Sequence, residues 1–361
     1  MKILLLVPVH KKEKTAPVLW QTGLPYFQAH NFWYKALTDL GHDVKLFIYS
    51  GGWERAENAF AKFNLEHNPL SSILQTALPS IRRKQKQILA LAQQFKPQLV
   101  ILSGNTNSIF PQTLFKIKKL YKSKLVLLNG VAPVVFATST ERKMAPFFDY
   151  IFTNDLYHTF DWQMLGAKNA QMLPISAIDP DVHKKYKLTE TEKKNLGSDV
   201  SFVGRFNPSL FYQNRIDYLE NLTDFNLKIW TDDKDLILSH PRLKKFFAGS
   251  ANGEKMLKIF SASKINLNIH ANFMLYGGNL RTFEIPSAGG FELVDKVDKN
   301  WFLGGKEIAS FNSVKALREK IKYYLSHPSE RQSIASAGNQ RVKKEHTYKY
   351  RFSELINIIS R

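Results

Sequence analysis

Strand-like apolar runs and helix-like stretches alternate along the first half of this chain. The apolar periodicity predicts strands at 2–9, 43–49, 98–103, 124–129, 147–153 and 170–175. It predicts helices at 26–40, 54–63, 80–95, 110–122 and 156–165. Alternation of this kind predicts an α/β fold, in which helices cover both faces of a parallel sheet and ligands bind at the carboxyl ends of the strands.

The same alternation begins again in the second half. Strands are predicted at 199–203, 226–230, 265–269 and 290–294, and helices at 209–222, 253–261, 280–288, 313–326 and 328–345. A chain of 361 residues exceeds the size at which a single core keeps growing. We therefore expect an N-terminal domain at 1–176, a linker at 177–197, a second domain at 198–346 and a last helix at 347–361.

Composition excludes several classes of protein. The chain has no cysteine, which excludes disulfides and thiolate metal sites. The apolar run at 2–9 is short and lacks a small-residue cleavage site after it, so we interpret it as a buried strand and not as a signal peptide. No apolar run approaches the roughly 20 residues that span a bilayer. We expect a cytoplasmic protein, with a peripheral position at the inner face of the membrane as an alternative.

The charge of the chain predicts an anionic partner. Lys and Arg number 51 against 31 Asp and Glu, which gives a formal net charge of +20. A phosphorylated substrate, an anionic lipid surface or a nucleic acid would each fit this excess. The basic residues are dispersed and form no recognised nucleic-acid motif, so we expect no nucleic acid among the partners.

Residues 276–284 (YGGNLRTFE) form the most specific motif. The glycines allow backbone N–H groups to approach a ligand, and a helix that begins near Asn279 or Leu280 directs the positive end of its dipole to the same place. One turn further in, the carboxylate of Glu284 could accept two hydrogen bonds from the hydroxyls of a ribose. The motif predicts a nucleotide site; a tight turn followed by a glutamate that complements the helix dipole is the alternative.

The second half resembles the glycosyltransferases of GT-B architecture, and within them the CgeB-like (spore maturation protein) group. The resemblance covers about residues 198–350 and rests on 201–205 (SFVGR), 263–268 (SKINLN), 278–291 (GNLRTFEIPSAGGF), Glu330-Arg331 and 341–348 (RVKKEHTY). It implies two facing Rossmann-like domains with a C-terminal helix that crosses back to the N-terminal domain. It also implies a transferase that moves a hexosyl or related group from a nucleotide-sugar donor to a surface glycan, a lipid-linked glycan or a protein, and that needs no cofactor.

One position departs from the wider group. Retaining GT-B enzymes carry a second glutamate eight positions before the ribose-binding one, and Tyr276 occupies that position here. The resemblance therefore supports donor binding better than it supports a retaining mechanism, and the stereochemical outcome stays open.

The resemblance extends the set of donor-binding candidates. Arg205 ends the first strand of the second domain, where the resemblance places a basic residue on the donor phosphates. Arg215 is a further candidate, with an ion pair to Glu220 as the alternative. Residues 246–249 (FFAG) resemble the base-contacting stretch, although the phenylalanines could equally be core residues. The donor-binding candidates are Gly23, Arg205, Arg215, Phe247, Gly249, Tyr276, Gly277, Gly278, Asn279, Arg281, Thr282 and Glu284.

Catalytic candidates lie in the N-terminal half. His10 follows the first predicted strand and could act as a general base for an acceptor hydroxyl, since histidine titrates near neutrality; an exposed histidine beside two lysines is the alternative. Asp155 is the second candidate base, with capping of the helix that starts at Leu156 as the alternative. Gly23 occupies the place of the glycine turn that GT-B enzymes have near the donor phosphates.

Two acidic triplets, Asp179-Pro-Asp181 and Asp233-Lys-Asp235, resemble metal-binding pairs, but strings this short arise by chance. We expect no metal, with the diphosphate stabilised by the helix N-terminus and arginine. Two alternatives remain open: a basic nucleic-acid-binding protein, and a GT-B sugar-nucleotide epimerase that needs no acceptor.

Overall fold

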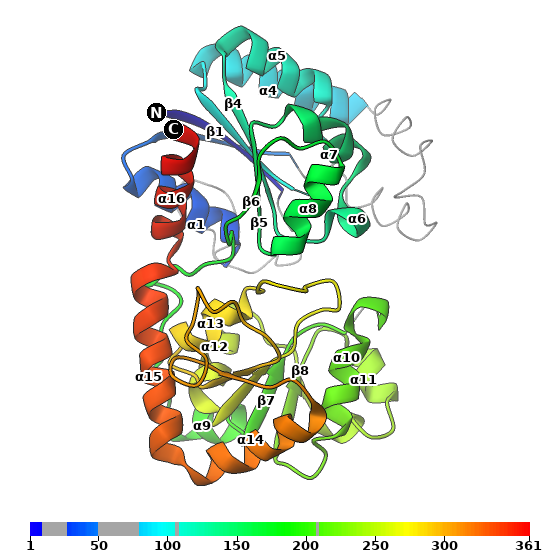
Figure 1. Ribbon diagram of the computed structural model, residues 1–361, viewed down its shortest axis with the longest axis vertical. Coiled ribbons are helices and arrows are strands. Elements are labelled where there is room, and N and C mark those ends of the chain that lie inside the picture. The colour runs from blue at the N-terminus through cyan, green and yellow to red at the C-terminus, as the bar shows by residue number, and fades with distance from the viewer. Residues whose placement is uncertain (9–26, 50–78, 105–107, 207–208) are drawn as a thin grey trace. The chain divides into compact units, whose positions relative to one another are not determined.

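The computed structural model describes residues 1–8, 27–49, 79–104, 108–206 and 209–361 (Figure 1). The chain forms two compact units. The first contains Met1–Ile175 and Phe352–Arg361, and the second contains Ser176–Arg351. The predicted helix at 54–63 lies outside the described residues.

The first unit is built on a parallel sheet in the order β2-β1-β3-β4-β5-β6. The strands are β1 (Lys2–Val7), β2 (Asp43–Ile48), β3 (Leu99–Ser103), β4 (Lys124–Asn129), β5 (Tyr150–Thr153) and β6 (Ala170–Met172). The helices are α1 (Ala29–Asp39), α4 (Pro79–Phe95), α5 (Pro111–Tyr121), α6 (Pro133–Phe136), α7 (Ser139–Met144) and α8 (Leu156–Met164). Every residue of the central β3 is buried, as expected for a strand covered by helices on both faces.

The second unit has a parallel sheet in the order β12-β11-β10-β7-β8-β9. The strands are β7 (Val200–Val203), β8 (Leu227–Trp230), β9 (Phe247–Gly249), β10 (Ile265–Asn268), β11 (Glu292–Val294) and β12 (Ala309–Ser310). The helices are α9 (Glu190–Leu196), α10 (Ser209–Glu220), α11 (Lys234–Ser239), α12 (Gly253–Ala262), α13 (Arg281–Ser287), α14 (Val314–Ser326) and α15 (Pro328–Glu345). A last helix, α16 (Tyr348–Ser360), begins in this unit.

The strand order of the second unit determines where a ligand can bind. From β7 the chain adds β8 and then β9 on one side, whereas β10, β11 and β12 extend the sheet on the other side. The order therefore reverses between β7 and β10. Connections at such a switch point leave the sheet in opposite directions and open a crevice at the carboxyl ends of the two strands.

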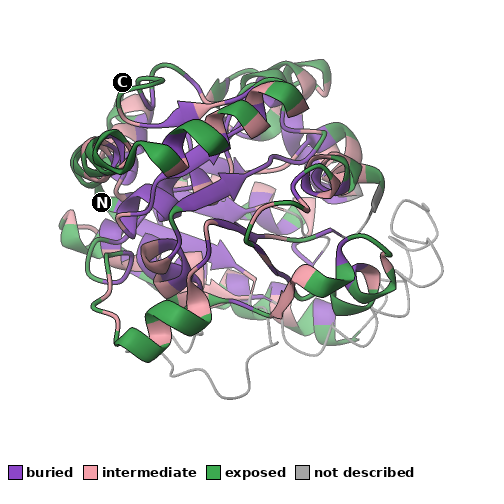
Figure 2. Ribbon diagram, turned by 90° about the horizontal axis from the view of Figure 1, so that it is seen from below, coloured by how far each residue is buried: buried purple, intermediate pink, exposed green. Residues whose placement is uncertain are grey.

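Burial follows the layered arrangement. In Figure 2 the strands are buried, while the helices carry exposed residues on their outward sides. The core of the second unit includes Phe202, Phe206, Ile229, Leu267 and Leu293, which come from the strands and the segment after β7. Among the described helices, none is both long enough and apolar enough to cross a membrane.

Helix α16 connects the two units along the chain. It begins at Tyr348 in the second unit, and its residues from Phe352 onward belong to the first. There Phe352 packs edge to face against Trp33 of α1, with ring centroids 5.9 Å apart. The expectation of a C-terminal helix that returns to the N-terminal domain is confirmed.

Most predicted strands and helices lie within a few residues of the observed ones. The sequence patterns missed short elements: α6, α7, α11, β9 and β12 have only two to six residues. The predicted linker at 177–197 lies in the second unit and contains α9, which a capping box between Thr189 and Glu192 starts.

His346, between α15 and α16, is buried as a neutral ring. Its Nε2 donates to the carbonyl oxygen of Trp301 at 2.8 Å, and Nδ1 accepts from the guanidinium of Arg351. Burial is the largest reason that the pKa of His346 falls to about 3, and the positive charge of Arg351 adds to it.

We expect this histidine to make the fold sensitive to mild acid. In the unfolded chain His346 takes up a proton near pH 6.5, whereas in the fold it stays neutral down to about pH 3. The unfolded state therefore binds more protons below pH 6.5, and the free energy of unfolding falls with pH by up to about 1.4 kcal/mol per unit. His346→Gln keeps one donor and one acceptor but does not titrate. Urea unfolding at pH 7.5 and 5.0 should show a loss about 2 kcal/mol smaller in the variant; equal losses would contradict the assignment.

Candidate functional site

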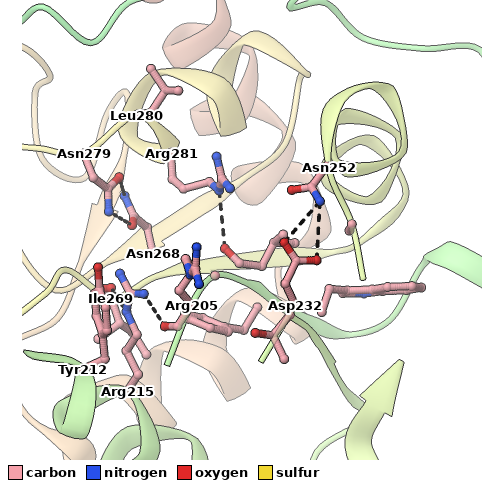
Figure 3. A pocket seen from close by; sticks show the side chains of 16 residues that line it. Arg205, Tyr212, Arg215, Asp232, Asn252, Asn268, Ile269, Asn279, Leu280 and Arg281 are labelled. Atoms are coloured by element: carbon pink, nitrogen blue, oxygen red, sulfur yellow. Dashed lines mark hydrogen bonds between the residues drawn. The ribbon is translucent and has the colours of Figure 1, made fainter. Parts of the chain in front are cut away.

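An open cavity of about 210 Å³ lies at the carboxyl ends of β7, β8 and β10, beside the switch point (Figure 3). Several sequence candidates line it: Arg205, Arg215, Asn279 and Arg281. The remaining lining residues are Phe202, Val203, Gly204, Tyr212, Trp230, Thr231, Asp232, Ala251, Asn252, Asn268, Ile269 and Leu280.

Arg215 is a buried cation fixed to the backbone at this cavity. Its Nε donates to the carbonyl oxygen of Ile269 at 2.8 Å, and Nη1 donates to that of Arg205 at 2.5 Å. The guanidinium carbon lies 4.3 Å from the ring centroid of Tyr212. Burial lowers the pKa of Arg215 to about 10, and nearby Arg281 adds to the decrease. Arg215 therefore joins β10 to the segment after β7, and the alternative pairing with Glu220 is not formed, since Glu220 pairs with His240.

Arg205 differs from Arg215 in exposure. Its side chain is 57% exposed, and its Nη2 lies 3.6 Å from Oδ1 of Asp233. Asp233 is also used structurally, because its Oδ2 accepts from the backbone N–H of Phe206 at 2.7 Å. Figure 3 shows the side chains of Arg205 and Arg281 entering the same space. An exposed, long cation of this kind can move to meet a ligand.

Arg281 is the first residue of α13 and forms an ion pair with Glu284, one turn further along. The carboxylate of Glu284 is 5% exposed, and its Oε1 lies 3.9 Å from Nε2 of His183. Burial lowers the pKa of His183, although the negative charge of Glu284 acts in the opposite direction. Glu284 is not among the residues that line the cavity, whereas its ion-pair partner Arg281 is.

The glycine-rich turn, residues 276–280 before α13, packs against Trp301. A Cβ atom at Gly278 would come within 2.6 Å of Cζ3 of Trp301 and 3.0 Å of Oγ1 of Thr282. Glycine at 278 is therefore required by this close approach. Gly277 is buried as well, while Tyr276 is 37% exposed. Thr282 is fully buried below the turn.

Asn268 connects this turn to the sheet. Its amide exchanges two hydrogen bonds with that of Asn279, of 3.2 Å and 2.8 Å. The same Nδ2 lies 3.1 Å from Oγ1 of Thr282 and donates to Oε1 of Glu292 at 2.8 Å. Burial raises the pKa of Glu292 well above its ordinary value, and the charge of Asp295 acts in the same direction. Both effects favour the neutral acid.

The stretch assigned to the base lies beside the cavity and does not line it. Phe247 packs against the core of the second unit, and Gly249 has a φ of +114° on the edge strand β9. The residues that follow, Ala251 and Asn252, are the ones that line the cavity. Asn252 donates to the carboxylate of Asp232 at 3.3 Å, and Ser250 also contacts it.

Three of the predicted site residues lie in the N-terminal half of the chain: His10, Gly23 and Asp155. His10 and Gly23 lie outside the described residues, so their assignments stay predictions. Asp155 is fully buried and caps α8, with Oδ1 accepting from the backbone N–H of Tyr157 at 2.9 Å. This is the capping role that the sequence allowed as the alternative.

The first acidic triplet is part of a turn, in which Oδ1 of Asp179 accepts from the N–H of Asp181 at 3.0 Å. Within the described part of the chain, no group of three or more His, Asp and Glu side chains is arranged to hold a metal ion.

The sequence reasoning missed Tyr212, the segment 230–232, Asn252 and Asn268. A signal was present for some of them. Residues 230–232 and Asn268 end strands β8 and β10, where ligand contacts gather in open α/β sheets. Tyr212 precedes Arg215 by three residues on a helix and therefore shares its face.

Comparison with known proteins finds a family match in the second half of the chain. Residues 213–357 match a family model described as glycosyl transferase-like. The spore protein CgeB of Bacillus subtilis (strain 168) is 23% identical over 218 residues, which cover 55% of this chain and 64% of that protein. The aligned region thus spans less than two thirds of the length of this relative.

Solved structures share the fold over nearly the whole chain. A sucrose-phosphate synthase from Thermosynechococcus elongatus is similar with a TM-score of 0.67 at 12% identity, covering 99% of this chain and 98% of that one. Anabaena Alr3699/HepE in complex with UDP-glucose is similar with a TM-score of 0.65 at 12% identity, covering 100% and 99%.

These findings confirm the resemblance and the fold class that the sequence predicts. The chain has the GT-B fold, and the family match favours a glycosyltransferase over the nucleic-acid-binding and epimerase alternatives.

Proposed function

We propose that this chain, a GT-B protein whose second unit matches a glycosyl transferase-like family, transfers a sugar from a nucleotide-sugar donor to an acceptor. The observation that carries the proposal is the gathering of Arg205, Arg215 and Arg281 at one open cavity beside the switch point of the sheet. Among the described residues that line this cavity, Asp232 is the single carboxylate. The charge balance favours an anionic ligand such as a diphosphate. The similarity to HepE, which was solved with UDP-glucose, supports a nucleotide-sugar donor.

Each of the three arginines would stabilise the diphosphate in a different way. Arg215 is held by two carbonyl oxygens and supplies a fixed positive charge. Arg205 is exposed and can follow charge that develops on the leaving group. Arg281 starts α13, where the positive end of the helix dipole acts in the same direction. Charge-assisted hydrogen bonds of this kind contribute roughly 1.5–3 kcal/mol each.

Glu284 is the proposed acceptor for the ribose hydroxyls. It lies one helical turn beyond Arg281, so a ligand whose diphosphate meets Arg281 would bring its ribose toward this carboxylate. A carboxylate can accept two such hydrogen bonds at once.

Glu284→Gln should weaken binding of nucleoside diphosphates by about tenfold, because the hydrogen bonds to a charged acceptor become bonds to a neutral amide. Calorimetry with ADP, CDP, GDP and UDP measures the effect, and thermal unfolding of the same samples checks the fold. Binding equal to that of the parent would show that Glu284 does not contact the ribose. If none of the four binds the parent protein, the proposed donor site is wrong.

We further propose that turnover needs no metal. Sugar transfer or donor hydrolysis should then persist in EDTA and fall in Arg205→Ala, with a larger effect on kcat than on KM because the charge on the diphosphate grows in the transition state. Loss of activity in EDTA that Mg²⁺ or Mn²⁺ restores would contradict this mechanism. Activity of Arg205→Ala equal to that of the parent would remove Arg205 from the site.

The acceptor is proposed to be a surface glycan, a lipid-linked glycan or a protein, in a cytoplasmic setting. The net charge of +20 supports an anionic acceptor or a peripheral contact with an anionic membrane. Sedimentation with anionic and zwitterionic vesicles distinguishes the two. Membrane contact predicts binding to the anionic vesicles alone, and binding that decreases with salt. No preference at low salt would leave an anionic acceptor in solution as the partner.

A further inference from the structure

Strand β10 carries two buried asparagines, Asn266 and Asn268, which face the same side of the sheet because side chains alternate along a strand. Asn266 bonds within the sheet and its neighbouring helix. Its Oδ1 accepts from Oγ of Ser201 at 2.7 Å, and its Nδ2 donates to the carbonyl oxygen of Phe260 at 3.1 Å. It does not line the cavity.

Asn268 makes a different set of contacts, two residues further along. Its amide pairs with that of Asn279 through two hydrogen bonds, and its Nδ2 also contacts Thr282 Oγ1 at 3.1 Å. Asn279 Oδ1 in turn lies 3.3 Å from the backbone N–H of Thr282. The amide of Asn268 therefore contacts Asn279 in the glycine-rich turn and Thr282 in α13, which lie 11 and 14 positions away in the sequence.

Glu292 is a further buried partner of the Asn268 amide. Its Oε1 accepts from Nδ2 of Asn268 at 2.8 Å, and the glutamate is 2% exposed. The orientation of the amide pair is set by the backbone N–H of Thr282, which donates to Asn279 Oδ1 and leaves Nδ2 of Asn279 to donate to Asn268 Oδ1. The other oxygen of Glu292, Oε2, is buried and has no hydrogen-bond partner among the described residues. Burying the carboxyl group of Glu292 with one oxygen unsatisfied costs free energy, so a glutamate at this position needs an explanation.

The position of these bonds supplies that explanation. Asn268, Asn279, Leu280 and Arg281 all line the cavity, so the amide pair joins two of its walls: the end of β10 and the turn before α13. Figure 3 shows the two amides facing each other beside Arg281 and Leu280. A shift of this turn would move Arg281 relative to Arg215, which is held by the neighbouring carbonyl oxygen of Ile269.

We propose that Asn268 is a positioning residue for the donor: its amide pairs with that of Asn279 and so fixes the turn that carries Leu280 and Arg281 into the cavity. The identity of the ligand that the turn binds rests on the proposed function. The statement that the amide pair fixes the turn does not depend on it.

The test compares Asn268→Ala and Asn279→Ala with Asn266→Ala as the matched control, which removes the same side chain from the same strand at equal burial. Two measurements are made on each protein. Hydrogen–deuterium exchange of residues 277–284 in the free protein reports the turn, and calorimetry with ADP, CDP, GDP and UDP reports the donor site. The side chain of Asn279 is less buried than that of Asn268, so Asn279→Ala should disturb the core less. It provides the test if Asn268→Ala does not fold.

We expect faster exchange at 277–284 and about tenfold weaker binding of the tightest nucleotide, or about 1.4 kcal/mol, in Asn268→Ala and in Asn279→Ala. The double variant should bind no worse than either single variant, because both remove the same amide pair. Asn266→Ala should lower the urea midpoint but leave exchange of the turn and nucleotide affinity unchanged.

Glu292 offers a second, conservative comparison. Glu292→Gln retains an oxygen that accepts from Asn268, so it should resemble the parent in both measurements. Glu292→Leu removes this acceptor but leaves the Asn268–Asn279 amide pair, so it should weaken nucleotide binding less than Asn268→Ala does.

Several results would overturn the proposal. Unchanged exchange at 277–284 in Asn268→Ala and Asn279→Ala would show that the amide pair does not hold the turn. Equal effects of Asn266→Ala would show that the network acts only on the stability of the core. If none of the four nucleotides binds the parent, the proposed function fails, and exchange at the turn still decides between these outcomes.

Discussion

The carboxyl end of β10 is the point on which the site depends. Two consecutive residues there hold the two walls of the cavity: Asn268 bonds the glycine-rich turn, and the carbonyl oxygen of Ile269 accepts from Arg215. The strand can do this because it lies between β7 and β11, beside the reversal of strand order. Both faces of the sheet are covered, so polar groups at the strand end must find protein partners or a ligand. The fold thus determines the place, and the identity of residues 268 and 269 determines what is held there.

The charges of the cavity are arranged with unequal freedom. Arg215 is 8% exposed, so it has lost most of its contact with water, and this burial lowers its pKa to about 10. Two carbonyl oxygens and the face of Tyr212 compensate for that loss. Arg205 remains largely in water, and its Nη2 lies 3.6 Å from Oδ1 of Asp233. A buried cation gives a field that is present before the ligand arrives, whereas an exposed one costs less to reorganise. Under the proposed function, the buried Arg215 would attract the diphosphate, and the exposed Arg205 could rearrange as the diphosphate binds and leaves.

The sequence predicted the layers of the fold better than the walls of the site. Periodicity over four or more apolar residues locates strands such as β3 and β4, because each is buried on both faces. It cannot locate β12, which has two residues, or β9, which has three. The motif at 276–284 was identified because glycine and glutamate at fixed spacing have a mechanism. Asn268 and Tyr212 were not, since their roles come from partners 11 or more residues away in the sequence or from a cavity that only the assembled sheet creates. Arg215 was ambiguous for the same reason: a mid-helix arginine next to an acidic neighbour looks exposed until the helix packs.

The ion pair between Arg281 and Glu284 bears on which anions the site would favour under the proposed function. Before a ligand binds, the guanidinium that faces the cavity and the buried carboxylate satisfy each other. An isolated phosphate or pyrophosphate that attracts Arg281 would weaken this pair and leave the carboxylate of Glu284 buried beside the ring of His183, whose pKa is lowered by burial; this is unfavourable. A nucleoside diphosphate avoids that cost, because its phosphates replace the carboxylate at Arg281 while its ribose hydroxyls donate to the carboxylate that has been released. The pair would therefore discriminate in favour of ligands that present negative charge and adjacent hydroxyls about one helical turn apart.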